Sequence, residues 1–79
     1  VIFGDVNAGA EIIAGGKIAI LGSLRGLAHA GANGNTMAVI SANSIDVTQV
    51  RIANLVREIE LKIDKCPVCK IKDNNIVIE

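Results

Sequence analysis

Alternation of apolar and polar residues over more than thirty positions is the feature that most constrains how this chain folds. Between positions 2 and 34 every even-numbered residue is apolar or glycine, and every polar residue lies at an odd-numbered position. A period of two predicts β-strands, because successive side chains of a strand point to opposite faces. The helical period of 3.6 does not fit this stretch. We therefore expect the even positions to face a shared aliphatic core and the odd positions to face outward.

The same stretch also repeats with a period of 18 residues. Residues 1–16 align with residues 19–34, which pairs Ile2 with Ile20 and Val6 with Leu24, and a weaker third copy begins near Met37. Strands usually span about 3–10 residues, so a strand pattern this long has to bend, and Gly and Asn tolerate the positive φ that corners need. Short strands that stack on their copies one coil later form a β-helix. The sequence predicts an all-β fold, a short β-solenoid of about three 18-residue coils followed by a C-terminal strand segment.

The outward positions of these predicted coils separate into an apolar and a polar set. The apolar positions would form two columns, Val1/Ala19/Met37 and Phe3/Leu21/Val39. The polar positions would form three columns, Asp5/Ser23/Ser41, Asn7/Arg25/Asn43 and Glu11/His29. Contiguous exposed apolar surface usually marks an interface, and a short solenoid buries little core by itself. We interpret the six apolar residues as a homodimer interface, while coverage by the chain's own C-terminal segment is the alternative.

The pattern is weaker in the second half of the chain. Residues 50–63 fit helical spacing at several apolar positions, yet Ile59, Leu61 and Ile63 also fit a strand, so helix and strand both stay open there. The last residues alternate on both sides of Asp73-Asn74-Asn75, which predicts a final pair of strands joined by a turn.

Length and charge narrow the classes of function. The 79 residues are expected to form a single domain, 1–79, and the start at Val1 indicates part of a longer protein. Eight basic and eight acidic residues leave no net charge, which disfavours nucleic-acid binding, and no apolar run reaches the roughly 18–20 residues of a membrane span. We expect a cytoplasmic protein without cofactor or metal.

Two glycine-rich segments carry a resemblance to a known family. The stretches Gly4–Gly16 and Gly22–Gly34, and above all Leu24-Arg25-Gly26-Leu27-Ala28-His29-Ala30-Gly31, resemble the C-terminal domain of MinC, the bacterial septum-site-determining inhibitor of cell division. The resemblance implies a right-handed triangular β-helix that dimerises and binds the MinD ATPase, which carries MinC to the inner face of the membrane. It also implies action against FtsZ polymers, mainly through an N-terminal domain absent from this sequence.

The resemblance implies a partner surface only by position, and two departures limit it. The implied MinD-binding residues are Asp5, Asn7, Glu11, Arg25, Gly26 and His29. An Arg-Ser-Gly-Gln segment associated with MinD binding in the family would precede Val1. Around Cys69 and Asn74-Asn75 the family more often has Ala and a turn with Gly.

Two features invite a chemical interpretation, although the function we expect is not enzymatic. Val6, Ile12, Ile18, Leu24 and Ala30 recur every six residues, as in hexapeptide-repeat acyltransferases, where His29 would be the general base. Cys66-Pro67-Val68-Cys69 has the spacing of half a zinc site or of a redox pair. With only two cysteines we favour packing, and a disulfide or a metal site is the alternative.

Overall fold

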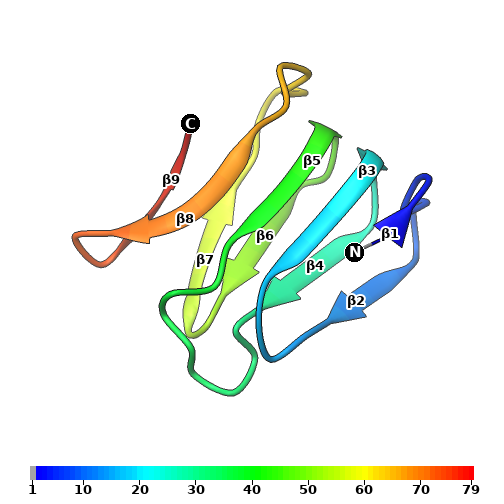
Figure 1. The fold of residues 1–79 in the computed structure, drawn as a ribbon. Coiled ribbons are helices and arrows are strands. Elements are labelled where there is room, and N and C mark those ends of the chain that lie inside the picture. Colours follow the sequence, from blue (N-terminus) through cyan, green and yellow to red (C-terminus); the bar gives the residue numbers. More distant parts are fainter. Residues whose placement is uncertain (1) are drawn as a thin grey trace.

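The computed structural model describes residues 2–79, and these residues form nine strands in two mixed sheets with no helix among them (Figure 1). The strands are β1 (Ile2–Phe3), β2 (Glu11–Ile13), β3 (Ile18–Leu24), β4 (Leu27–Ala30), β5 (Ile40–Ile45), β6 (Gln49–Ile52), β7 (Leu55–Glu58), β8 (Val68–Lys72) and β9 (Asn75–Ile78). One sheet has the order β1-β3-β5-β8-β9 and the other the order β2-β4-β6-β7. The predicted all-β class is confirmed.

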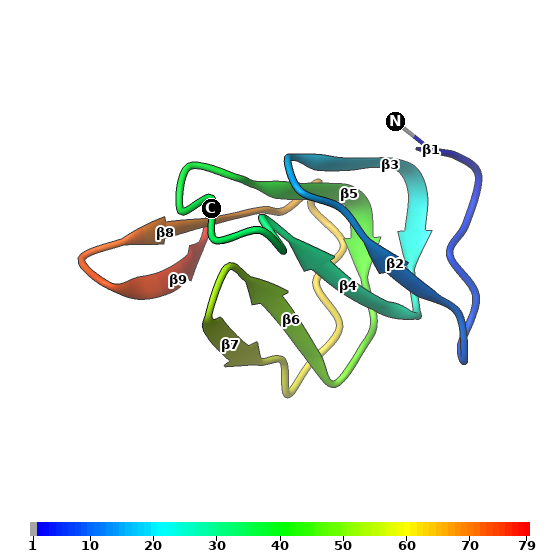
Figure 2. The ribbon, with the colours of Figure 1, turned by 90° about the horizontal axis from the view of Figure 1, so that it is seen from below.

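The N-terminal half winds back onto itself, so that strands from successive passes of the chain lie side by side. β1, β3 and β5 are parallel in one sheet, and β2, β4 and β6 are parallel in the other. Figure 2 shows β3 beside β5 and β4 beside β6. The predicted pairs Ile2/Ile20 and Val6/Leu24 are confirmed in register, and the Gly4 amide donates to the Leu21 carbonyl at 3.3 Å.

The 18-residue spacing is wrong beyond these first contacts, because the connections between strands differ in length from one pass to the next. β2 pairs with β4 at a shift of 16 residues, as in Ile12 with Ala28, and β3 pairs with β5 at a shift of 22, as in Ile18 with Ile40. The larger shift follows from the long connection between β4 and β5, residues 31–39. A corner at the surface accepts extra residues, whereas a shifted strand would expose its apolar face.

Four of the predicted outward columns are therefore corrected. Ser23 lies beside Ser44 and not beside Ser41. Ala19 lies beside Ser41 and not beside Met37, so Met37 and Val39 do not continue the apolar columns. Glu11 lies beside Leu27 and not beside His29. Val1 lies outside the described residues.

The core is aliphatic, and within residues 2–34 its buried side chains are at even positions, although Ala8, Ala10 and Ala32, also at even positions, are exposed. The largest fully buried side chains in the parallel part belong to Ile20, Leu24, Ile40, Ile45, Val50 and Ile52. None of the eight polar residues at odd positions between 2 and 34 is buried. Small side chains at Ala28 and Ala30 complete the layer between the two sheets.

Two antiparallel hairpins finish the fold. The helical alternative for residues 50–63 is wrong, since β6 and β7 pair there through the turn Ala53-Asn54. The final strand pair is confirmed: β8 and β9 are antiparallel, and Asp73 and Asn74 both have positive φ in the two-residue turn. Within residues 2–79 there is no helix long and apolar enough to cross a membrane.

Candidate functional site

A charged corner joins the first and second passes of the chain. Arg25 Nη2 donates to Asp5 Oδ2 at 2.9 Å, and the Ser23 amide donates to Asp5 Oδ1 at 2.8 Å. Both members of the ion pair are about half exposed, at 45% and 46%, so they remain accessible to a partner. We call Asp5 and Arg25 the charged corner. The structure thus brings together two of the residues that the resemblance assigns to the partner surface.

Gly26 has a structural reason to be glycine beside this corner. It is buried, and a Cβ there would lie 2.5 Å from the Ala10 carbonyl oxygen and 2.7 Å from that of Asn7. Real Cβ atoms do not approach backbone oxygens so closely, so the two passes can meet here only through glycine. The side chain of Asn7 is exposed next to this contact.

Glu11 and His29 lie on the other sheet and are not a facing pair. Glu11 is exposed on β2, whereas His29 is half-buried on β4 between Ile13 and Arg51 in register. The His29 Nε2 atom is 2.9 Å from the Ala53 carbonyl oxygen, which joins β4 to the β6–β7 turn. An imidazole held this way between an apolar side chain and a guanidinium gives no support to an acyl-transfer site.

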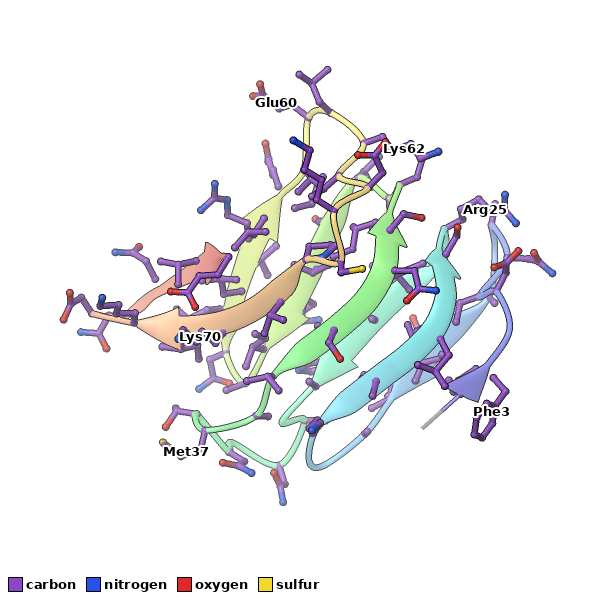
Figure 3. All side chains as sticks on the ribbon, turned by 45° about the horizontal axis from the view of Figure 1, so that its top comes forward. Phe3, Arg25, Met37, Glu60, Lys62 and Lys70 are labelled. Atoms are coloured by element: carbon purple, nitrogen blue, oxygen red, sulfur yellow. The ribbon has the colours of Figure 1, made fainter. Side chains whose placement is uncertain are left out.

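The exposed apolar side chains divide into separate groups. Phe3 and Leu21 are in register on β1 and β3, and they are 82% and 52% exposed. We call these two residues the Phe3–Leu21 patch. Met37 is 85% exposed, but Figure 3 shows it on the opposite side of the molecule from Phe3. The half-buried Ala19 and Val39 add little apolar surface.

Two residues outside the predicted site contribute to these surfaces. Ile13 is 60% exposed beside His29, and its odd position already indicated an outward side chain. The buried Ser44 donates from Oγ to Ser23 Oγ at 2.7 Å, behind the charged corner. The sequence does not indicate this contact, because the third pass of the chain is longer than 18 residues and an 18-residue spacing places Ser41 beside Ser23.

The two cysteines are free and lie on opposite sides of the strand. Cys69 is fully buried opposite Ile40, and burial raises the pKa of its thiol to about 11, so it stays protonated and unreactive at neutral pH. Cys66 is exposed, and the segment between them runs along β5 through hydrogen bonds to Asn43 and Ala42.

No group of three or more His, Cys, Asp or Glu side chains in the described part of the chain could hold a metal ion. Cys69 belongs to the buried core cluster.

The chain is similar in sequence to a known protein family and to curated proteins of several bacteria. The family model described as septum formation inhibitor MinC, C-terminal domain, matches residues 1–79. The septum site-determining protein MinC of Bacillus subtilis is 45% identical over 83 aligned residues, which cover 99% of this chain and 36% of that protein. The probable MinC of Heliobacterium modesticaldum is 43% identical over 100% of this chain and 29% of its own length.

A solved structure is similar to this chain in fold as well as in sequence. A chain of the MinC:MinD cell division protein complex of Aquifex aeolicus superimposes with a TM-score of 0.91 at 36% identity, over 99% of this chain and 67% of that one. This chain spans about a third of the length of the two curated relatives. The strand arrangement, the family match and these identities together show that the chain belongs to the family of the septum formation inhibitor MinC, at its C-terminal domain.

Proposed function

We propose that this chain is the non-enzymatic dimerisation and partner-binding domain of a septum-site inhibitor of cell division, and that its partner is the MinD ATPase. The observation that carries the proposal is its likeness, over nearly its whole length, to a chain of a MinC:MinD complex. The parallel passes of the chain support the finer proposal that the fold is a short right-handed triangular β-helix.

The charged corner is the proposed centre of the MinD contact. The Arg25 guanidinium has five N–H donors, and its ion pair with Asp5 engages one nitrogen, so donors remain for a partner. The hydrogen bond that the Ser23 amide donates to Asp5 holds this carboxylate in place without a partner. A preorganised charge at the rim of an interface mainly contributes specificity and a faster association rate. Asn7, Glu11, Gly26 and His29 complete the proposed surface.

The Phe3–Leu21 patch is the proposed centre of the homodimer interface. Its two side chains are large, apolar and adjacent on one sheet, and burial of a Leu or Phe side chain contributes about 1.5–3 kcal/mol. An isologous dimer would bring two such patches together and bury four of these side chains. Ala19, on the same strand as Leu21, stays in the proposal, and Val1 does so only by its sequence-based assignment, whereas Met37 and Val39 are left out of it.

The remaining parts of the proposal concern the parent protein. We propose that residues 1–79 are one domain and that an N-terminal domain carries most of the action against FtsZ. The protein would be cytoplasmic and would reach the inner face of the cell membrane only through MinD.

Charge reversal at the corner tests the MinD contact. Arg25→Glu places two carboxylates together and inverts the charge that the partner meets, so we expect binding to ATP-loaded MinD to weaken at least about tenfold. Isothermal calorimetry with MinD from the same organism measures the affinity, and circular dichroism checks that the variant is folded. Lys17→Glu, an equal charge reversal at another exposed position, should bind as the natural chain does. Full binding by a folded Arg25→Glu variant would show that MinD uses another face.

A further inference from the structure

Three turns meet at the end of the molecule opposite the charged corner and form an open groove. They are the connection before β5, the β6–β7 turn and the β8–β9 turn, seen at the lower left of Figure 1. The groove has a volume of about 480 Å³, within the range of roughly 300–1,000 Å³ typical of ligand sites. Figure 3 places Met37, which lines this groove, and Arg25 at opposite ends of the molecule, so the groove is separate from the proposed MinD contact.

The lining combines apolar walls with exposed amide groups. Met37, Leu55 and Ile71 supply aliphatic or thioether surface, and Met37 is 85% exposed. Asn54 and Asn74 are exposed at the two hairpin turns on the rim. Each of their amides offers two donors and one acceptor, which matches the carbonyl and N–H groups of a peptide backbone.

The charge of the groove is negative. Among the residues that line it, Asp73 is the only ionisable one. The neighbouring Lys72 does not line the groove. Lys70, and to a smaller extent Lys72, hold the pKa of the Glu79 carboxyl below its ordinary value. An acidic peptide or a phosphate group would meet only repulsion from Asp73, whereas a lysine or arginine would find its counter-ion beside an apolar wall.

From this lining we propose that the groove binds an extended segment of a partner protein that carries an aliphatic side chain next to a lysine or arginine. The aliphatic side chain packs between Met37, Leu55 and Ile71, the peptide backbone bonds to the Asn54 and Asn74 amides, and the cation pairs with Asp73. This inference does not depend on the MinD contact or on the dimer, because it uses different residues at the other end of the fold.

An NMR titration of the 79-residue chain tests the groove with two blocked peptides, Ac-Leu-Lys-Leu-NH2 and Ac-Leu-Glu-Leu-NH2. We expect amide shifts from the lysine peptide to concentrate on the three turns, with a dissociation constant in the millimolar range, and a weaker response to the glutamate peptide. Asp73→Asn should weaken binding of the lysine peptide about two- to fivefold, which is the effect of losing an exposed ion pair. It should not weaken binding of the glutamate peptide. Asn tolerates the positive φ of this position, so the variant should fold.

Two further variants separate the charge from the apolar contact. Met37→Ala should weaken both peptides, because it removes an exposed wall of the groove. Asp64→Asn removes an exposed carboxylate outside the groove and should change neither. Shifts spread over the whole surface, or no shifts at millimolar peptide, would overturn the proposal. Equal binding of the two peptides with no effect of Asp73→Asn would overturn its assignment to a basic partner segment.

Discussion

At the scale of single residues, backbone geometry at glycines determines where the chain can turn and where two of its passes can touch. Gly26 permits two passes of the chain to touch, and the four glycines with positive φ, among them Gly4 and Gly31, serve the corners. Sequence alone indicated that Gly and Asn serve the corners, because both tolerate this geometry, but it did not indicate which of them have a positive φ. It could not identify the β6–β7 turn, since Ala53 adopts a φ of 54° that alanine rarely takes.

Alanine substitutions at two glycines test the close contact at Gly26. Gly26→Ala should lower the free energy of unfolding by about 1–3 kcal/mol, because its Cβ would collide with two backbone oxygens that cannot move independently. Gly16→Ala is the matched control: its Cβ would have no atom within 4 Å, and its φ is not positive, so it should be neutral or stabilising by up to about 1 kcal/mol. Urea denaturation measures both, and equal midpoints would refute this explanation of Gly26.

At the scale of elements, the strands of the first two passes and the final strand pair followed from the sequence, whereas the register of β5 and the β6–β7 hairpin did not. Alternation assigned Ile20 and Leu24 to the core because every polar residue of that stretch lies at an odd position. The register of β5 could not be predicted, since extra residues between β4 and β5 change the spacing without changing the alternation. For the same reason Ser23 was correctly predicted beside Asp5, whereas the contact of Ser23 with Ser44 was not predicted.

The two sheets are also linked at the far end, where Arg57 on β7 reaches β9. Its Nη1 atom donates to the Ile76 carbonyl at 2.9 Å. Arg57→Ala should reduce stability by about 1 kcal/mol and accelerate amide hydrogen exchange in β9, while β3 and β4 keep their protection. Lys62→Ala removes an exposed positive charge nearby and should alter neither quantity. Unchanged exchange in β9 would mean that the Arg57 bond does not hold the sheets together.

At the scale of the whole molecule, small size makes association advantageous. The chain exposes 4690 Å², against roughly 12,000 Å² for an unfolded chain of its mass, so folding buries only about 60% of that surface. The Phe3–Leu21 patch then remains as apolar surface that a second copy can cover. Sequence predicted these two residues as interface, and it wrongly aligned Met37 with them because it assumed equal coils.

Solution mass measured by light scattering, for the natural chain and two variants, tests the dimer most directly. We predict twice the 8.2 kDa of one chain for the natural sequence, a folded monomer for Leu21→Glu, and an unchanged dimer for Met37→Glu, whose side chain is more exposed than that of Leu21 but lies away from the patch. A monomeric natural chain, or a dimer that persists in Leu21→Glu, would contradict the account.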